Sequence, residues 1–335
     1  METLADFGVA DYFGIPTLST GIFRNWLAGG DKDAAMKLAA VMLFFVFLLT
    51  LFEAWNRKGK AETVGKTAKQ AVRIELGRKT KWAVTGLCAV PVILGFAIPV
   101  LRLLYNAVQH TDAQTKDQFF KYAFNSLTVA LTVSILTVLI AIVLSYAQRK
   151  TNSKLTKISI RLSTFGYALP GALLAVGLLA PIGIFDQSLT RFVKAHSSWS
   201  GGLILSGTIA LLVYALTIRF LTVAFNALSS GFEKIPTSMD AAARSLGAKP
   251  LSLIRRIHIP LLSQSLIVAM ILVFIDVLRE LPATLILRPF NFDTLATRIY
   301  WLASDERLIE ASTAALAIIV MGLIPVILLN RKLDK

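Results

Sequence analysis

The charged residues that could do chemistry in this chain lie inside or beside long apolar runs. Asp276 and Glu280 are four residues apart, so on one helix they would share a face, and Arg219 interrupts a separate apolar run. If these runs cross a membrane, charges within them face a bundle interior or a cavity, where carboxylates attract or ligate cations. The alternatives are a local ion pair with Arg279 that anchors the helix, and snorkelling of Arg219 toward the headgroups.

Other catalytic and ligand-binding patterns are weak. Residues 59–67 imitate a phosphate-binding loop, but five residues separate the glycines where four are required, and no apolar strand precedes them. His110, His196 and His258 stand alone in three loops, so no metal site is assigned. A single cysteine, Cys88, excludes a disulfide framework. The sequence therefore predicts neither an enzyme nor a cofactor in this chain.

Composition places the chain in a membrane. Of 335 residues, 55% are hydrophobic and 16% are charged, and the mean hydropathy is +0.66. Soluble domains carry about 25% charged residues and about 45–50% apolar ones. The net charge of +15 lies in short tracts between apolar runs rather than on a basic face, so no nucleic-acid partner is expected. This pattern predicts an all-α polytopic membrane protein.

The apolar runs also predict the number of spans. A helix needs roughly 20 mostly apolar residues to cross about 30 Å of hydrocarbon. Seven segments satisfy this requirement: 34–55, 82–108, 122–147, 162–184, 203–228, 259–280 and 308–330.

The cations between these spans predict the orientation. Alternate loops carry 22 Lys and Arg on one side and nine on the other. Cytoplasmic loops are enriched in such cations, so loops 56–81, 148–161 and 229–260 and the C-terminus are expected in the cytoplasm. Residues 1–33 are expected on the outside.

The start of the chain resembles its own end. The matching residues are Trp26-Leu27-Ala28 with Trp301-Leu302-Ala303, Asn56-Arg57-Lys58 with Asn330-Arg331-Lys332, and Glu2 and Asp6 with Asp276 and Glu280. The alternative is chance matching within a biased apolar composition. Transporters are often built from repeats, so we expect a duplicated unit.

This repeat divides the chain into three parts. Residues 1–55 are interpreted as the tail of a first repeat, 56–81 as a basic cytoplasmic linker near anionic lipid, and 82–335 as one six-helix repeat. A missing first half, or a homodimer, would complete the assembly. If a two-fold axis relates the copies, Glu2, Asp6, Asp276 and Glu280 would converge at the mouth of a pathway.

Loop 229–260 has the features of a short, well-terminated helix. Thr237 or Ser238 is expected to cap its start, and Asp240 in the first turn complements the helix dipole. Gly247 suits the left-handed residue just past the end, and Pro250 can open a second helical stretch. Such a compact helix suits docking in the groove of another protein.

The same loop resembles the signature loop of permease subunits of binding-protein-dependent ABC importers. That signature is Glu-Ala-Ala, three residues, Gly, nine residues and Ile-x-Leu-Pro, and this chain has Ala242-Ala243, Gly247 and Ile257-His258-Ile259-Pro260. Two residues depart from it. Ala241 stands at the glutamate position, with Asp240 one residue earlier and rotated by about 100° on a helix, and Ile259 replaces the leucine.

The resemblance implies a role for each matching residue. Coupling to an ATPase subunit is expected at Asp240, Ala241, Ala242, Ala243, Gly247, Ile257 and Pro260. Residues 278–297 resemble permeases of ferric-iron ABC importers, and 2–8 and 11–14 resemble the matching stretch in the first half of those permeases. That family is a fused duplication of two six-helix halves.

Taken together, the resemblance implies a type I ABC importer permease in a bacterial inner membrane. A periplasmic or extracellular binding protein would deliver ferric iron, and two copies of a separate ABC subunit would hydrolyse ATP. Glu2, Asp6, Arg219, Asp276 and Glu280 are the candidates for the translocation path. Within the class, polyamine, thiamine, phosphonate or sulfate remain alternative substrates. An ion-coupled secondary transporter and a membrane-embedded enzyme are the alternatives from other classes.

Overall fold

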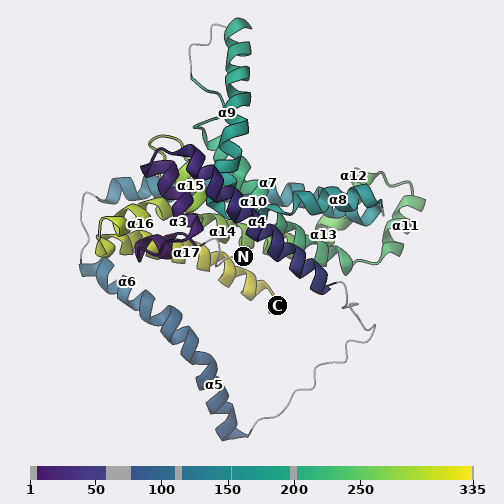
Figure 1. Ribbon diagram of the computed structural model, residues 1–335. Helices are drawn as coiled ribbons and strands as arrows, with labels where there is room; N and C mark the ends of the chain where they lie inside the picture. The colour runs from purple at the N-terminus through teal and green to yellow at the C-terminus, as the bar shows by residue number, and fades with distance from the viewer. Residues whose placement is uncertain (1–5, 58–76, 110–114, 152, 197–201, 334–335) are drawn as a thin grey trace.

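The computed structural model describes residues 6–57, 77–109, 115–151, 153–196 and 202–333, and these residues form helices and turns without a β-strand (Figure 1). The elements in the first part are α2 (Gly8–Tyr12), α3 (Leu18–Phe23), η1 (Arg24–Ala28) and α4 (Lys32–Arg57). They are followed by α5 (Arg78–Val92), η2 (Ile93–Ala97), α6 (Ile98–Gln109), α7 (Thr115–Lys150), α8 (Lys154–Ser163) and η3 (Gly166–Ala168). The remainder comprises α9 (Gly171–His196), α10 (Ile209–Glu233), α11 (Thr237–Ser245), α12 (Pro250–Leu253), η4 (Ile254–His258), α13 (Ile259–Leu261), α14 (Ser263–Leu278), α15 (Pro282–Leu287), α16 (Leu295–Ser304) and α17 (Leu308–Leu333).

Six helical segments in the described part are long and apolar enough to cross a membrane. They are Lys32–Glu53, Arg78–Gln109, Gln118–Lys150, Gly171–His196, Ile209–Glu233 and Leu308–Arg331. A seventh is possible if Pro250–Leu261 and Ser263–Leu278, which meet at 79°, count as one broken span. The all-α membrane class and the number of about seven spans are therefore confirmed.

The predicted span 162–184 is wrong in its position. Helix α8 ends at Ser163, a turn of 3₁₀-helix occupies Gly166–Ala168, and α9 starts at Gly171 and continues to His196. A Cβ at Gly166 would overlap the backbone carbonyl of Ile218, so the chain approaches α10 too closely there for a side chain. Hydropathy alone missed this break because the residues on both sides of it are apolar.

Two other predicted spans are also displaced. The span 203–228 is helical over Ile209–Glu233, and the span 259–280 is interrupted at Leu262 and ends at Leu278. Both shifts have the same cause. Backbone hydrogen bonds and caps determine where a helix begins and ends, whereas the hydropathy pattern shows only where apolar residues lie.

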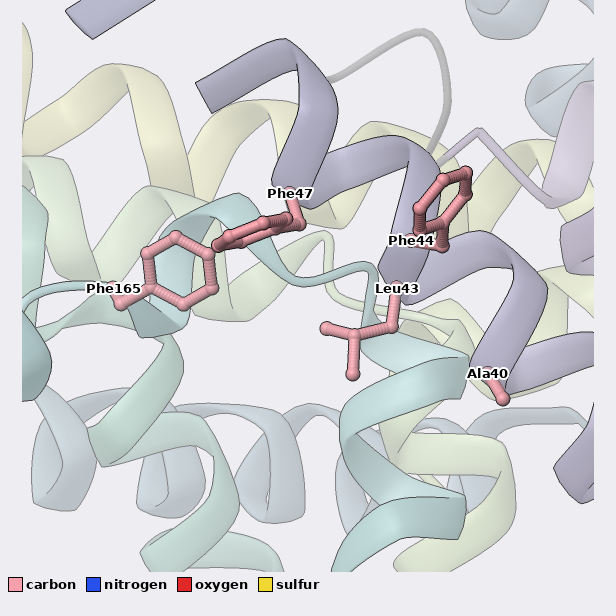
Figure 2. Close-up of a pocket in the computed structure, with 5 residues that line it drawn as sticks. All are labelled: Ala40, Leu43, Phe44, Phe47 and Phe165. Atoms are coloured by element: carbon pink, nitrogen blue, oxygen red, sulfur yellow. The ribbon is translucent and has the colours of Figure 1, made fainter. Parts of the chain in front are cut away.

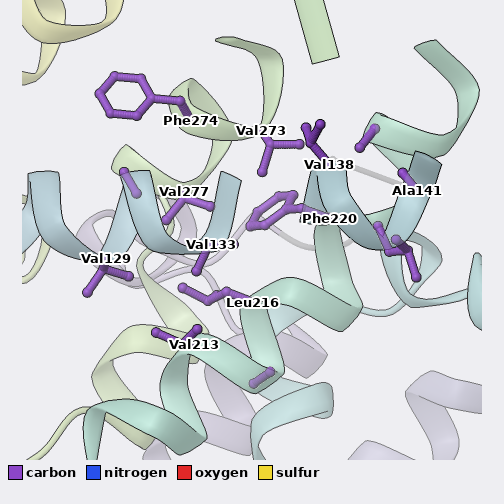
Figure 3. Packing of buried hydrophobic residues seen from close by; sticks show 14 of the residues in the cluster. Val129, Val133, Val138, Ala141, Val213, Leu216, Phe220, Val273, Phe274 and Val277 are labelled. Carbon is purple, nitrogen blue, oxygen red and sulfur yellow. The ribbon is translucent and has the colours of Figure 1, made fainter. Parts of the chain in front are cut away.

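The core of the bundle lies between α7, α10 and α14 (Figure 3). Small residues are fully buried where these helices meet: Ala130, Ala141, Ala215, Ala224 and Ala269. In a membrane, lipid tails are as apolar as leucine, so helices associate through close van der Waals packing rather than hydrophobic burial. The alanines permit this close approach, and larger side chains such as Leu216, Phe220 and Val273 fill the space between them.

The segment α5–η2–α6 extends away from this core (Figure 1). No residue in the apolar stretch of Arg78–Gln109 is buried against the rest of the described chain. It meets the rest of the described chain at α17, where the side-chain amide of Asn106 donates to Ser312 Oγ at 3.4 Å. The proposed linker 56–81 lies largely in residues 58–76, which are outside the described residues.

The N-terminal helices pack on α9 through Ile22, Met42 and Val176. On the neighbouring side of α4, Ala40, Leu43, Phe44 and Phe47 line an apolar cavity of about 340 Å³ together with Phe165 (Figure 2).

Both ends of the chain use the same helix cap. Thr17 caps α3 and Thr294 caps α16, each in a reciprocal capping box with a threonine three residues later, Thr20 or Thr297. A residue with positive φ stands three positions before each cap, at Gly14 and at Asn291.

The two long helices that follow these caps also match. Gly30 and Glu306 have positive φ shortly before α4 and α17, and both of these helices are long. The stretch from Thr17 to Gly30 is one residue longer than the stretch from Thr294 to Glu306. The longer, N-terminal stretch contains the π-helix Arg24–Ala28. A π-turn holds one more residue than an α-turn and so absorbs the extra one. The two stretches thus have equivalent backbones, while the division of the chain into domains stays a prediction.

Asp186 provides the first test of this fold. Its fully buried carboxylate on α9 accepts hydrogen bonds from the backbone N–H groups of Ile204, Leu205 and Ser206 at 2.6–3.0 Å. We predict that Asp186→Asn lowers the stability by about 1–3 kcal/mol, because the amide presents N–H groups where an acceptor is required. Thermal unfolding of the purified protein measures this loss. The exposed neighbour Gln187, changed to Ala, is the control, and an equal melting temperature for both variants would contradict the prediction.

Candidate functional site

The helix predicted in loop 229–260 is α11, and it ends as expected. Gly247 has φ +79°, the N–H of Ala248 donates to the carbonyl of Ala243 at 3.0 Å, and that of Gly247 donates to Arg244 at 2.9 Å. These bonds form a Schellman motif, in which the left-handed residue closes the helix. Pro250 opens α12, as predicted. The predicted cap is wrong, because Pro236 occupies the N-cap position and no side chain bonds to the helix start.

The acidic residue of α11 points into the protein. Asp240 is buried, and its carboxylate accepts hydrogen bonds from Arg149 Nε at 2.7 Å and Nη2 at 3.3 Å. The same guanidinium donates to the carbonyls of Phe232, Ile235 and Pro236. The sequence identified Asp240 but gave no signal for Arg149, which counts there as one of several loop cations. Asp240 therefore does not present a carboxylate on the outer face of the helix.

The other signature residues divide between the two faces of the loop. Ala243 is buried and Ile257 packs in the same cluster, whereas Ala241, Ala242 and Pro260 are exposed. The outer side also carries two strongly exposed apolar side chains, Leu246 at 88% and Leu251 at 76%.

His258 is the buried residue beneath this helix. It is fully buried, its ring lies 5.1 Å from that of Phe232 and 5.7 Å from that of Tyr146, and its Nε2 is 3.4 Å from Asp240 Oδ1. The sequence treated it as an isolated loop histidine, but it belongs to the Arg149–Asp240 cluster.

A second charged site lies inside the bundle. Arg219 Nη1 on α10 is 3.4 Å from Glu280 Oε1, and both side chains are largely buried. Glu280 also accepts a hydrogen bond from the backbone N–H of Ala283 at 3.1 Å, at the start of α15. Arg219 is thus paired in the interior rather than snorkelling to the headgroups.

The predicted shared face of Asp276 and Glu280 is wrong. Helix α14 ends at Leu278, so Glu280 lies beyond it. Asp276 forms an ion pair at 2.7 Å with Arg279, whose side chain is 60% exposed. The local pair expected for Asp276 is present, while the partner of Glu280 comes from another helix.

The N-terminal carboxylates are less central than expected. Glu2 lies outside the described residues, and Asp6 is exposed and accepts a bond from the N–H of Val9. Among the described residues, no group of three or more His, Cys, Asp or Glu could hold a metal ion.

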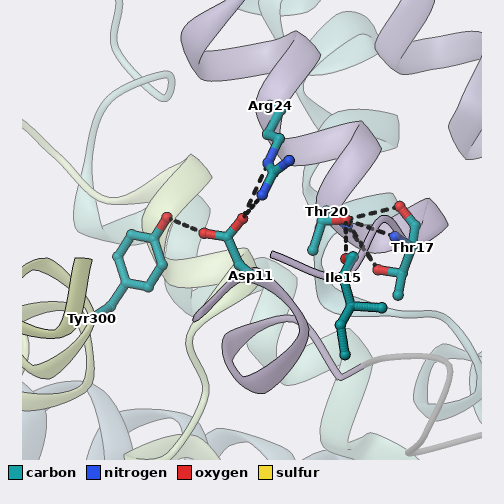
Figure 4. Close-up of polar contacts among 6 residues, drawn as sticks. All are labelled: Asp11, Ile15, Thr17, Thr20, Arg24 and Tyr300. Carbon is teal, nitrogen blue, oxygen red and sulfur yellow. Dashed lines mark hydrogen bonds and ion pairs between the residues drawn. The ribbon is translucent and has the colours of Figure 1, made fainter. Parts of the chain in front are cut away.

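Asp11 instead joins the N-terminal segment to the C-terminal one. Its carboxylate accepts a hydrogen bond from Tyr300 at 2.9 Å and pairs with Arg24 at 3.0 Å (Figure 4). Burial, followed by the bond to Asp11, raises the pKa of Tyr300 to about 12, so the phenol stays a donor at physiological pH.

The glycine at the start of α9 tests the buried pair. A Cβ at Gly171 would overlap both Arg219 Nη1 and Glu280 Oε1, whereas one at Gly177 in the same helix meets nothing within 4 Å. We predict that Gly171→Ala forces these two side chains to shift and destabilises the protein by about 1–3 kcal/mol. Gly177→Ala is the matched control and should stabilise it by about 0.5–1 kcal/mol. Thermal unfolding distinguishes the two, and equal melting temperatures would disprove the steric argument.

Comparison with known proteins places these features in a family. Over 99% of its length the chain is 25% identical to the Fe(3+)-transport system permease protein FbpB 2 of Haemophilus influenzae, and it spans 63% of that protein. It is 26% identical over 63% of its length to the putative 2-aminoethylphosphonate transport system permease protein PhnV of Salmonella paratyphi A, covering 72% of that protein.

A solved structure shares the fold. It is a chain of a bacterial alginate ABC transporter in complex with an alginate pentasaccharide-bound periplasmic protein. The TM-score is 0.50 at 17% identity, over 76% of this chain and 94% of that one. Residues 137–335, which contain the Arg149–Asp240 cluster, the Arg219–Glu280 pair and α11, match the model for binding-protein-dependent transport system inner membrane components. The chain belongs to this family of ABC importer permeases.

Proposed function

We propose that this chain forms the translocation path of an ATP-driven importer for ferric iron. The structural feature that supports the importer role is α11, a short helix at the surface of the bundle. Leu246, directly after its last residue, exposes an apolar side chain there. Similarity to an Fe(3+)-transport permease along 99% of the chain supports iron as the cargo. Similarity to a 2-aminoethylphosphonate permease makes this phosphonate the second candidate.

The ATPase partner is proposed to dock on α11. Ala241 and Ala242 form a small, smooth surface beside Leu246, which would enter an apolar groove. Two copies of an ABC subunit would hydrolyse ATP, so no cofactor is assigned to this chain. Their closure would move α11 and switch the bundle between inward and outward access as a rigid body.

The proposal also covers the membrane orientation of the chain, the binding protein and a second permease half. The elements α8, α11 and α12 gather at one end of the bundle (Figure 1), which we assign to the cytoplasm together with the C-terminus because of its cations. A binding protein would deliver the substrate at the other side of a bacterial inner membrane. A second permease half or a second copy of the chain would complete the path.

The path itself is proposed to pass the buried charges. Arg219 and Glu280 are held within the bundle, and Asp276, Asp6 and Glu2 are assigned to its outer mouth by the repeat. Negative potential at that mouth would attract a cation released by the binding protein.

Reconstitution into vesicles tests the cargo. Vesicles that contain the chain and its ATPase subunits are supplied with the binding protein loaded with ferric iron. Radioactive iron should accumulate in their lumen only when ATP is present. Uptake of 2-aminoethylphosphonate without iron uptake would select the second candidate. Accumulation that needs an ion gradient and no ATP would instead indicate a secondary transporter.

Gly247 tests the coupling loop. A β-branched residue at φ +79° is strained by roughly 1–2 kcal/mol, so Gly247→Val should distort the end of α11 and reduce transport while the protein still inserts. Gly207 has φ +76° and open space around it, as Gly247 has, so Gly207→Val reproduces the strain outside the loop. Both variants are compared for iron uptake per inserted protein. Equal losses would show that strain alone, and not the coupling loop, is responsible.

A further inference from the structure

The guanidinium of Arg149 uses all of its hydrogen-bond donors. An arginine side chain has five N–H groups in a fixed planar arrangement. Nε donates to Asp240 Oδ2 at 2.7 Å, and Nη2 donates to Asp240 Oδ1 at 3.3 Å and to the carbonyl of Pro236 at 3.0 Å. Nη1 donates to the carbonyls of Phe232 and Ile235 at 2.8 and 2.9 Å. Each donor therefore has its own acceptor.

These acceptors lie within residues 232–240, which join the end of α10 to α11. Phe232 lies in the last turn of α10, and Ile235 and Pro236 form the connection to α11, which contains Asp240. The carbonyl of Phe232, at the C-terminal end of α10, carries partial negative charge and therefore attracts the guanidinium. Arg149, at the end of α7, thereby fastens three elements together.

This cluster is protected from water. The side chains of Arg149 and Asp240 are 10% and 9% exposed, and the fully buried His258 covers the carboxylate from a further side. The ring of Phe232 lies 5.9 Å from the guanidinium carbon. Buried charges of this kind are costly to separate, so we expect the Arg149–Asp240 contact to stay intact when α11 is displaced.

We propose that Arg149 is the positioning residue that makes α11, the end of α10 and the end of α7 one rigid body. A displacement of α11 is then passed directly to α7 and α10, which form the bundle core, instead of being absorbed by the connecting turns. Asp240 acts as the internal anchor of the coupling helix and does not contact the ATPase. This inference rests on the proposed function, because it explains how docking on α11 reaches the translocation path.

The chemistry of the cluster also determines which substitutions are informative. Lysine supplies one point charge with three donors and cannot reproduce the planar set of five. Arg149→Lys and Arg149→Gln should each lower the amount of substrate transported per ATP hydrolysed by about tenfold. Asp240→Asn should behave in the same way. Lys150→Gln is the matched control, because it removes an exposed cation from the adjacent position and should retain wild-type coupling.

A variant that removes both charges protects the test against misfolding. Arg149→Met combined with Asp240→Leu leaves no unpaired buried charge, and such apolar replacements are often tolerated. It should accumulate in the membrane at normal levels and still be uncoupled, because the bonds to the three carbonyls are lost. Wild-type coupling in this double variant would overturn the proposal.

A distance measurement tests the rigid body without any ATPase. Spin labels at the exposed residues Thr151 and Ser245 report the separation between the end of α7 and α11 in the purified chain. The distance distribution should be narrow in the wild type and broad in Arg149→Gln. In the reconstituted complex, the wild-type distance should not change upon ATP binding. A narrow distribution in Arg149→Gln, or a wild-type distance that shifts with ATP, would refute the rigid linkage.

Transport and coupling measurements distinguish the proposed function from the role of Arg149. Absence of ATP-driven transport in the wild type would contradict the proposed function, whereas coupled transport in every Arg149 and Asp240 variant would contradict only this inference.

Discussion

Removing a charged side chain from water costs several kcal/mol unless a counter-charge or hydrogen bonds replace the lost solvation. Among the described residues of this protein, three sets of buried charges have such compensation. Arg219 faces Glu280, Arg149 holds Asp240, and Asp186 accepts backbone N–H groups. Because each set joins residues from separate segments, the requirement for compensation also fixes how those segments lie against one another. The breaks near Gly171, Leu205 and Pro236 all occur beside one of these charges.

Helix α10 links the two charged sites. It carries Arg219 near its middle, and its last turn supplies the carbonyl of Phe232 to Arg149. Thirteen residues of α-helix separate these positions, a distance of about 20 Å. A helix packed over most of its length against α7 and α14 moves as a unit, so the Arg149–Asp240 cluster and the Arg219–Glu280 pair share a rigid element. This arrangement connects α11 rigidly to the interior of the bundle.

The two similar stretches at the ends of the chain show how a turn can gain a residue without disturbing its neighbours. The caps at Thr17 and Thr294 and the positive φ values at Gly30 and Glu306 place equivalent turns before the long helices α4 and α17. The extra residue in the first copy lies in a stretch that contains a π-helix, where it lengthens one turn without altering the turns on either side.

The sequence by itself determined the features that depend on local composition. Long apolar runs predicted membrane helices, and Gly247 followed by Pro250 predicted where α11 ends and where α12 starts, because both depend on a few adjacent residues. Only the tertiary structure decided which charges meet. Arg149 and Asp240 are far apart in the chain, as are Arg219 and Glu280, and their pairing depends on how α7, α10 and α14 pack. The helical period placed Asp276 and Glu280 on one face, but α14 ends between them, and beyond the helix Glu280 pairs with Arg219 and accepts the Ala283 N–H.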